Sequence, residues 1–149
     1  MEIKKAGISD LDLIVPLFDA YRQFYKQESD PKKVRAFLHT RIQKEESVIL
    51  LAVMEGQEMV MGFTQLYPSF SSVSMQRLWI LNDLFVDKKH RKKGVATALM
   101  NTARQLAEDT RSKGLVLETG KENTQAQALY EKLGYIKEED YFVYNLRTG

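Results

Sequence analysis

The segment that most constrains the fold runs from Trp79 to Met100 and reads WILNDLFVDKKHRKKGVATALM. Its first part is rich in large apolar side chains up to residue 86, as in a buried strand. A short basic loop follows and ends at Gly94. Small and apolar residues then recur at helical spacing. The pattern predicts a strand, a basic loop and an amphipathic helix that begins at about Gly94.

The start of this helix suits a phosphorylated ligand. The first turn of a helix has backbone N–H groups without intrahelical partners and a partial positive charge, so it can bind a pyrophosphate. Gly94 and Ala96 leave room for close approach. Thr97 can add a hydroxyl, although a threonine that simply packs or faces solvent is equally ordinary. The basic loop alone also fits nuclear localisation, RNA binding or a solvated surface.

The motif Arg91-Lys92-Lys93-Gly94-Val95-Ala96 resembles the Arg/Gln-x-x-Gly-x-Gly/Ala signature with which the GNAT superfamily of N-acetyltransferases holds the pyrophosphate of acetyl-CoA. A later stretch, Glu118-Thr119, Asn123 and Ala126 to Tyr135, is similar to the second acetyl-CoA-contacting segment of that family. Ala96 is an accepted variant of the second glycine. Lys92 replaces a common glycine and makes the loop more positive, so that Lys92 or Lys93 can contact the 3′-phosphate of CoA.

The resemblance implies an α/β fold: a mixed central sheet of six to seven strands with a splayed parallel pair, flanked by about four helices. One domain is expected over residues 1–149. The residue patterns predict strands at 3–6, 47–54, 59–67, 76–86 and 115–118, a serine-rich bend at 68–74, and a final hairpin of strands at 135–137 and 141–146. Helices are predicted from Leu11, from Pro31, from Gly94 and from Thr124.

Two helix starts carry capping signals. Ser9 and Asp12 have the spacing of a capping box, and Pro16 is expected to interrupt and bend the first helix. Asp30 and Pro31 are favoured at the cap and at the first helical position of the second helix.

The family implies acetyl-CoA as co-substrate and no metal ion. The pantetheine arm of acetyl-CoA is expected to pair with backbone groups at the end of the first splayed strand. The expected acetyl-CoA-binding residues are Leu84, Phe85, Val86, Arg91, Lys92, Lys93, Gly94, Val95, Ala96, Thr97, Asn123, Ala126, Tyr130 and Lys132. For Asn123, a helix cap before Thr124 is an equally good reading, and the two roles can coexist.

Amide formation needs a group that takes a proton from the amine and an acid near the departing thiolate. Tyr130 occupies the position of the tyrosine that many GNAT enzymes place near the thioester sulfur, so it is the expected acid. The alternative is a packing tyrosine, because Ala126, Leu129 and Leu133 share its helical face.

Asp83 and Glu118 are the candidate bases. A charge in a nearly apolar strand is costly unless it is paired or functional, which favours Asp83, although a salt bridge to Arg77 or a lysine is the structural alternative. Strand alternation predicts that Asn82 and Asp83 point to opposite faces. Glu118 is expected on the neighbouring strand and ranks second.

In the family, the first helices and the loop after the third strand line the acceptor groove. The expected substrate-binding residues are Tyr21, Phe24, Tyr25, Tyr67, Phe70, Asn82 and Asp83. Aromatic rings with a carboxylate suit an aliphatic cation, whereas the alternative is that most of these rings belong to the core. The stretches 20–27 and 66–73 are similar to a GNAT subgroup that includes yeast enzymes acetylating histones and polyamines.

Composition narrows the class of protein. With 22 basic and 20 acidic residues the net charge is +2, too small for a general nucleic-acid footprint. The chain has no cysteine, which removes disulfides, thiolate metal sites and a cysteine nucleophile, so acyl transfer is expected to be direct. No apolar run is long enough for a membrane span, and a cytoplasmic protein is expected.

The expected function is therefore transfer of the acetyl group of acetyl-CoA to a primary amine, either of a small polyamine-like or amino acid-like molecule or of a lysine or N-terminus in a peptide. The expected partners are acetyl-CoA, the amine acceptor and a second copy in a homodimer, with no nucleic acid and no membrane. The alternatives are a non-catalytic acyl-CoA-binding regulatory module and a nucleic-acid-associated protein. The enzyme is favoured because the chain retains Tyr130 and a candidate base.

Overall fold

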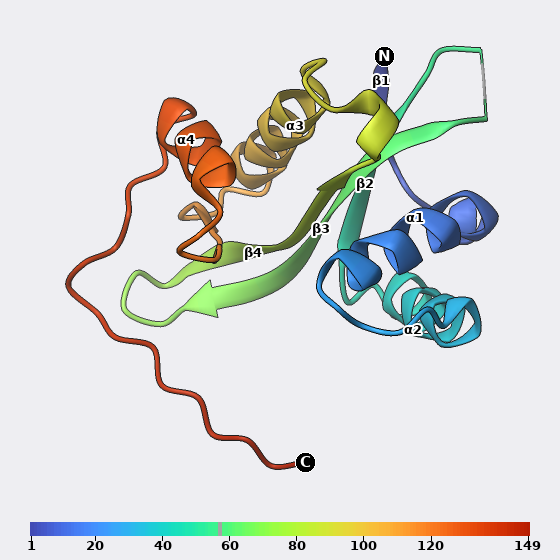
Figure 1. The fold of residues 1–149 in the computed structure, drawn as a ribbon. Coiled ribbons are helices and arrows are strands. Elements are labelled where there is room, and N and C mark those ends of the chain that lie inside the picture. The colour runs from blue at the N-terminus through green and yellow to red at the C-terminus, as the bar shows by residue number, and fades with distance from the viewer. Residues whose placement is uncertain (57) are drawn as a thin grey trace. The chain divides into compact units, whose positions relative to one another are not determined.

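Five strands form one sheet in the order β1-β2-β3-β4-β5 (Figure 1). The computed structural model describes residues 1–56 and 58–149 and divides into two compact units, Met1–Leu117 and Glu118–Gly149. The first unit contains β1 (Glu2–Lys5), α1 (Leu11–Phe24), α2 (Pro31–Gln43), β2 (Val48–Val53), β3 (Val60–Ser71), β4 (Gln76–Val86), α3 (Val95–Asp109) and β5 (Leu115–Val116), with short 3₁₀ turns at Ile8–Asp10 and Lys88–His90. The second unit contains α4 (Thr124–Lys132). The single-domain organisation stays a prediction.

The first four strands pair antiparallel, and β5 pairs parallel with β4. The predicted hairpin, the strand at 76–86 and the parallel partner after the long helix are thus confirmed, with the residue at position 57 of the hairpin turn outside the described residues. The predicted bend at 68–74 is wrong in its first half, because β3 continues through Pro68 to Ser71. The pairing of β2 ends at Leu66, so Pro68 lies where β3 has a free edge and its missing N–H costs no ladder hydrogen bond.

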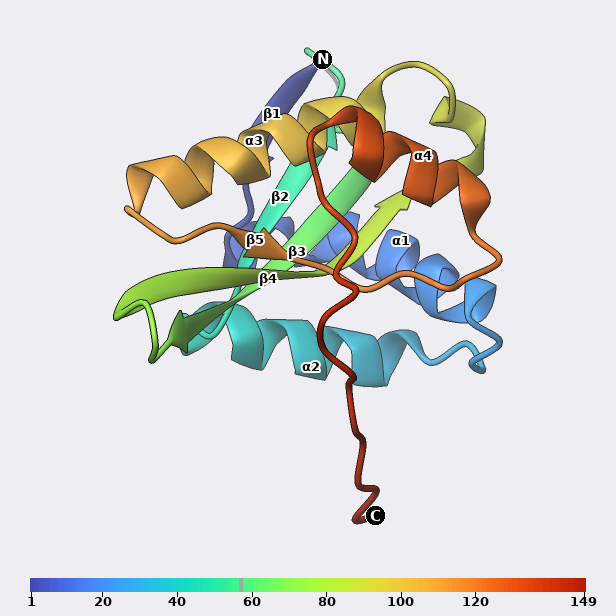
Figure 2. The same ribbon diagram turned by 90° about the vertical axis from the view of Figure 1, so that its left-hand side faces the viewer.

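Helices cover both faces of this sheet (Figure 2). On one face, apolar residues of α1 and α2 pack with β2 and β3 around Ile14, Leu38 and Phe63, which are fully buried. On the other face, α3 contributes a buried stripe that includes Leu99 and Met100. These two layers fix the ends of β3 and β4, where the candidate site lies.

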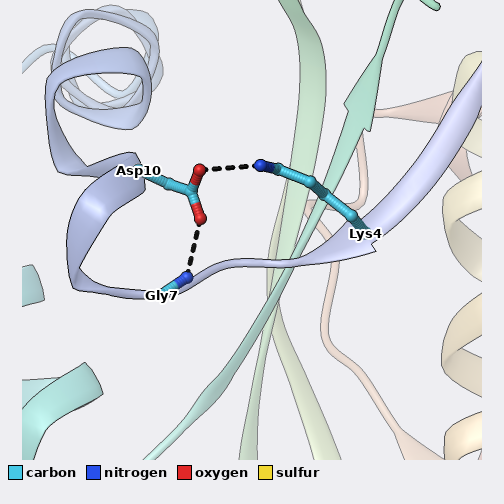
Figure 3. A network of polar contacts seen from close by, with 3 residues as sticks. All are labelled: Lys4, Gly7 and Asp10. Carbon is cyan, nitrogen blue, oxygen red and sulfur yellow. Dashed lines mark hydrogen bonds and ion pairs between the residues drawn. The ribbon is translucent and has the colours of Figure 1, made fainter.

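The start of α1 differs from the predicted capping box at Ser9 and Asp12. A 3₁₀ turn precedes the helix, and the Asp10 carboxylate accepts 2.8 Å hydrogen bonds from Gly7 N–H and from Lys4 Nζ (Figure 3). Burial acts to raise the pKa of Asp10, but the Gly7 N–H and the Lys4 charge outweigh it, so this pKa lies below its usual value. The hydrogen bonds of the Asp10 carboxylate thus take the place of the predicted capping box. The helix then runs continuously through Pro16, so the predicted interruption is wrong.

The other helix caps follow the sequence. Asp30 accepts a 3.1 Å hydrogen bond from Lys33 N–H, with Pro31 at the first position of α2. In the second unit, Asn123 Oδ1 accepts a 3.3 Å hydrogen bond from Ala126 N–H and caps α4.

The predicted hairpin after Gly134 is wrong: within the described residues 135–149 no strand forms. The side chains from residue 136 onward are exposed, and a strand without a partner leaves its backbone groups unpaired. In the part of the chain that the structure describes, the sheet consequently has five strands, and the predicted six to seven is also wrong.

Candidate active site

The basic loop is tied to the end of β4. Asp87 N–H donates to Met61 O at 2.8 Å, and the Asp87 carboxylate accepts from Lys89 N–H at 2.9 Å. Arg91 turns back along the strand, because its Nε donates to Val86 O at 3.0 Å and its guanidinium carbon lies 5.4 Å from the centre of the Phe85 ring. The loop therefore holds the cationic side chain of Arg91 next to the end of β4.

The loop passes into α3 through two left-handed residues, Lys92 with φ 63° and Gly94 with φ 79°. Gly94 is the N-cap, and no side chain from residues 1–56 or 58–149 caps the helix. The first-turn amides of Val95, Ala96 and Thr97 are consequently available to a ligand. The predicted helix start at Gly94 is confirmed, and the exposed side chains of Lys92 and Lys93 lie beside it in the sequence.

A second glycine allows close packing beneath this turn. A Cβ on Gly62 of β3 would lie 2.9 Å from Phe85 O and 3.2 Å from Val95 Cγ1. Gly62 therefore lets β3, the end of β4 and the first turn of α3 meet within van der Waals contact.

The parallel pair separates early. Trp79 and Ile80 are the residues of β4 that pair with β5, whose ladder ends at Val116. Residues 81–86 of β4 continue without a β5 partner among the described residues. On the side facing away from β3, the backbone of Leu84, Phe85 and Val86 thus has no ladder partner among the described residues, although Val86 O accepts from Arg91 Nε.

A β-bulge sets the orientation of the polar residues in β4. Leu66 pairs with Leu81 and Gln65 with Asp83, so Asn82 is an extra residue between them. The bulge breaks strand alternation, and Asn82 Nδ2 donates to Asp83 Oδ1 at 3.1 Å. The prediction that these two side chains point to opposite faces is wrong for this reason.

Asp83 is a buried carboxylate held by neutral donors. Asp83 is only 6% exposed. Oδ1 accepts from Tyr21 Oη at 2.8 Å as well as from Asn82, and Oδ2 accepts from Gln65 Nε2 at 2.8 Å. None of the ion pairs between described residues includes Asp83, so the predicted structural alternative, a salt bridge to Arg77 or a lysine, is absent from that part of the chain.

The charge of Asp83 acts on two phenols. Burial and then the negative charge of Asp83 raise the pKa of Tyr21 far above its ordinary value. The same two causes raise the pKa of Tyr67 to about 12. Both phenols therefore stay protonated at physiological pH and can donate hydrogen bonds.

Several predicted acceptor-side rings gather around Tyr21. Its ring centre lies 5.2 Å from that of Tyr25 and 5.7 Å from that of Phe85, and Phe24 lies 5.3 Å from Tyr25. Phe24 and Tyr25 are 59% and 57% exposed, which leaves their faces open to a ligand.

Phe70 does not join this group. It pairs with Arg77, five residues along β3 from the Gln65–Asp83 pair, which at about 3.4 Å per residue separates it by roughly 17 Å. Its ring contacts the Arg77 guanidinium, 5.3 Å from the ring centre.

The remaining predicted residues belong to the second unit. Asn123, Ala126, Tyr130 and Lys132 lie on or at the start of α4, and the half-buried Tyr130 has its ring centre 6.0 Å from that of Tyr135. Glu118 is exposed and follows the end of β5 at Val116, so the expectation that it lies on the neighbouring strand is wrong.

Two functional candidates were missed by sequence reasoning. Gln65 is fully buried, and its Oε1 has no hydrogen-bond partner among the described residues, although its Nε2 donates to Asp83. Thr64 Oγ1 donates to Asp83 O at 2.7 Å and fixes the backbone of the same residue. Adjacent threonine and glutamine inside the apolar strand MGFTQL was the available signal.

The sequence profile described as "Acetyltransferase (GNAT) family" matches residues 14–135. The chain belongs to the GNAT family. It is 46% identical over 148 residues to "Uncharacterized N-acetyltransferase YhfO" of Bacillus subtilis (strain 168), covering 99% of this chain and 98% of that one. It is 36% identical over 118 residues to a "Probable acetyltransferase" of Haemophilus influenzae, covering 79% and 80%.

A solved structure described as that of a probable acetyltransferase superposes with a TM-score of 0.96 at 40% identity, covering 100% of this chain and 99% of that one. As a GNAT member with acetyltransferase relatives, the protein is an acetyl-CoA-dependent N-acetyltransferase. Nothing in these comparisons supports the non-catalytic alternative. Among the helices of the described residues, none has the length and apolarity needed to cross a membrane.

Proposed function

We propose that this GNAT enzyme transfers the acetyl group directly to the primary amine of an aliphatic cation, and that Asp83 binds that amine and takes its proton. The observation that carries the proposal is the Asp83 carboxylate, which is buried beside aromatic rings and has no cationic partner among the described residues. A buried carboxylate without a counter-ion is costly, so its retention in this strand has its simplest explanation in function.

The hydrogen bonds of Asp83 leave capacity for one more donor. Each carboxylate oxygen can accept about two hydrogen bonds. Oδ1 accepts two, from Tyr21 and Asn82, whereas Oδ2 accepts one, from Gln65. Gln65 Oε1 is a second unused acceptor. An ammonium group or a water molecule that bridges to the amine can donate to these two oxygens.

The described residues also fit acetyl-CoA. The uncapped amides of Val95, Ala96 and Thr97 are donors for the pyrophosphate, and Arg91, Lys92 and Lys93 supply positive charge for its phosphates. The side of Leu84, Phe85 and Val86 that has no ladder partner among the described residues offers backbone groups to the pantetheine arm. When bound, acetyl-CoA supplies an acetyl thioester, and the residues named here hold and orient it.

For the acid that protonates the leaving thiolate we propose Tyr130. The support is its place in the family motif and its half-buried position on α4. Asn123, Ala126 and Lys132 on the same helix are the proposed contacts to the pantetheine and the nucleotide, and Glu118 remains the second choice for the base.

The proposed acceptor is a small polyamine-like or amino acid-like molecule, with a peptide lysine or N-terminus as the other candidate. Support comes from Tyr21, Phe24 and Tyr25, whose rings gather near a carboxylate and suit a cation on an alkyl chain. The stretches 20–27 and 66–73, on which the resemblance to the yeast histone and polyamine subgroup was predicted, support this class. We further propose that the enzyme works in the cytoplasm, without nucleic acid or membrane partners, in keeping with its net charge of +2.

The test begins with thermal unfolding in the presence of acetyl-CoA, CoA or no ligand. Thiol release is then measured with a panel of polyamines, amino acids and basic peptides. We expect acetyl-CoA and CoA each to stabilise the protein. We also expect thiol release to depend on one class of amine. If no amine in the panel accelerates thiol release while acetyl-CoA still stabilises the protein, the proposed acceptor class is wrong.

Tyr130→Phe separates the acid from the binding site. The variant is expected to lose most of the amine-dependent rate and to keep the thermal shift with CoA, because the ring remains and the proton donor is lost. Tyr141→Phe, an exposed tyrosine in the same unit, is the matched control. An unchanged rate in Tyr130→Phe would assign the ring to packing alone.

A further inference from the structure

Gln65, which is fully buried in β3, presents an amide oxygen that has no hydrogen-bond partner among the described residues. Its Nε2 donates to Asp83 Oδ2 at 2.8 Å. Because a carboxylate oxygen only accepts hydrogen bonds, the amide has to turn its NH₂ group toward Asp83 and keep Oε1 for another donor. A buried acceptor without a donor is costly, so we expect Oε1 to gain a partner when the substrate binds.

Oε1 and Asp83 Oδ2 are spaced for two hydrogens of one nitrogen. Gln65 and Asp83 face each other in the β3–β4 ladder. The oxygen and the nitrogen of one amide lie about 2.2 Å apart, so Oε1 lies within roughly 5 Å of Oδ2. Two N–H bonds of a tetrahedral nitrogen, each in a hydrogen bond of about 2.9 Å, reach acceptors about 4.7 Å apart. A single amine nitrogen can therefore donate to both oxygens at once.

The aromatic rings beside Asp83 mark the way to these oxygens. Asp83 keeps a small exposed fraction, and Tyr21, which donates to it, is half-buried. The centre of the Tyr21 ring lies 5.2 Å from that of Tyr25 and 5.7 Å from that of Phe85. Oε1 is enclosed, so we expect these rings to move apart when the amine enters. The alkyl chain behind the nitrogen would then lie among the rings.

We propose that Gln65 makes the enzyme selective for primary amines. Its Oε1 accepts a hydrogen bond from the N–H that remains in the amide product, while Asp83 Oδ2 takes the proton that leaves. The inference rests on the proposed function, in which Asp83 is the base. It assigns the choice of amine class to a residue outside the proposed acetyl-CoA contacts.

Two hydrogens have to be held in this reaction. The ammonium first gives one proton to water, and the neutral amine, with two hydrogens and a lone pair, forms the bond to the acetyl carbon. The nitrogen is then positively charged and still carries both hydrogens. Asp83 Oδ2 takes one as a proton, the carbon–sulfur bond breaks with its electron pair going to sulfur, and the proposed acid protonates that sulfur. The second hydrogen stays hydrogen-bonded to Gln65 Oε1 throughout.

A secondary amine lacks one of these hydrogens. Its neutral nitrogen carries a single N–H, which Asp83 has to take, so Gln65 Oε1 is left buried and unpaired. A site built around a hydrogen bond from the substrate rejects an analogue that lacks the donor. We expect kcat/KM for a primary amine to exceed that for its N-methyl derivative at least about tenfold.

The test compares a diaminoalkane with its derivative that carries one methyl group on each nitrogen. If another amine of the panel reacts faster, that amine and its N-methyl derivative take their place. Thiol release at saturating acetyl-CoA gives kcat/KM for both, and the ratio of the two values does not depend on the fraction of active enzyme. Gln65→Met keeps the length of the side chain and removes Oε1, so the ratio is expected to fall to within about threefold of one.

Thr64→Val is the matched control. Thr64 is also fully buried, and its Oγ1 donates to Asp83 O at 2.7 Å, so this variant disturbs the same strand without removing Oε1. Its ratio is expected to equal that of the parent. Gln65→Asn draws the amide oxygen back by one CH₂ group and carries the same expectation as Gln65→Met, which preserves the test if the latter variant does not fold.

A parent enzyme that uses both amines equally well would overturn the proposal and leave the proposed function intact. A folded Gln65 variant that keeps the parent's ratio would also overturn it, because the discrimination would then come from the bulk of the methyl group. If no amine accelerates thiol release, the proposed function is wrong and this inference with it.

Discussion

Tyr21 Oη donates a 2.8 Å hydrogen bond to Asp83 Oδ1 although the two residues lie 62 positions apart in the chain. The bond joins α1 to the bulged part of β4. Because burial and the charge of Asp83 raise the pKa of Tyr21, the phenol keeps its proton and acts as a donor across the physiological range. Tyr21 therefore orients Asp83 and does not compete with it as a base.

Asp83→Asn is expected to lower kcat/KM for the amine by about a hundredfold or more, since general-base catalysis typically contributes that much. The thermal shift with acetyl-CoA should remain, because Asp83 is not among the proposed contacts to the nucleotide. Steady-state thiol release at saturating acetyl-CoA measures the first effect and thermal unfolding the second. A variant with the parent's rate would remove Asp83 from the reaction.

Tyr21→Phe keeps the ring and deletes the donor to Asp83. The expected loss is about 1.5–3 kcal/mol in the free energy of unfolding, as for a hydrogen bond to a charged group. The amine-dependent rate should fall as well, because the carboxylate loses one of its positioning bonds. Urea denaturation and thiol release are compared with those of Tyr141→Phe, whose phenol is exposed. Equal losses in both variants would contradict a specific role for Tyr21.

Ala96→Asp places a negative charge in the first turn of α3. This charge is expected to stabilise the helix but to weaken the binding of acetyl-CoA. The helix itself gains about 0.3–1 kcal/mol from an acidic residue at its N-terminus. The KM for acetyl-CoA is expected to rise about tenfold or more, because the carboxylate repels the pyrophosphate. Asn101→Asp adds the same charge further along the helix on an exposed position and should leave KM unchanged.

Gly62→Ala tests the close packing between β3, β4 and α3. A Cβ there would meet the Phe85 carbonyl oxygen at 2.9 Å, so the backbone must shift, at an expected cost of about 1–3 kcal/mol. Gly114→Ala is the control, since a Cβ at Gly114 meets no atom within 4 Å. The free energy of unfolding is measured for both variants, and equal stabilities would show that the strands can relax without cost.

Acid stability should depend on Asp19. The Ser29 hydroxyl, which donates at 2.6 Å, and the Asp30 N–H hold the pKa of Asp19 below its usual value. A lowered folded-state pKa stabilises the protein above the unfolded-state pKa of about 3.9, and this stabilisation is lost as pH falls through the folded-state value. Asp19→Asn is therefore expected to be less stable than the parent at pH 7, with the difference narrowing below about pH 4.

Thermal unfolding of both proteins from pH 7 to pH 3 measures this difference. Asp12→Asn, in which the changed side chain is exposed, serves as the control for removal of a carboxylate from the same helix. A gap between Asp19→Asn and the parent that stays constant across this range would contradict the role given to Asp19.

Local signals predicted much of the fold. The starts of α2, α3 and α4 depend on Asp30, Gly94 and Asn123, and each of these residues acts on backbone groups within one turn of itself. The start of α1 at Leu11 was predicted, but its capping box was not formed, because Asp10 is held partly by Lys4, on a strand outside the helix.

Asp83 could be singled out from the sequence, but the residues that contact it could not. Asp83 stood out as a charge in an apolar strand, yet its partners come from α1 and β3. The bulge at Asn82 depends on how β4 aligns with Leu66 and Gln65 of the neighbouring strand, which the sequence of β4 alone does not specify. The prediction of the final hairpin was wrong for the same reason. A strand needs a partner strand, and the sequence of one strand does not specify that partner.

The parallel ladder between β4 and β5 joins Trp79 to Leu115, with the whole of α3 between them, while β2, β3 and β4 are consecutive neighbours linked by short turns. Contacts close in sequence form sooner than distant ones, so we expect the antiparallel meander to assemble before β5 docks. The part of the proposed acetyl-CoA site beside residues 84–86 would then form late in folding. Acetyl-CoA should in consequence lengthen the lifetime of the folded protein by slowing unfolding, with little effect on the rate of folding.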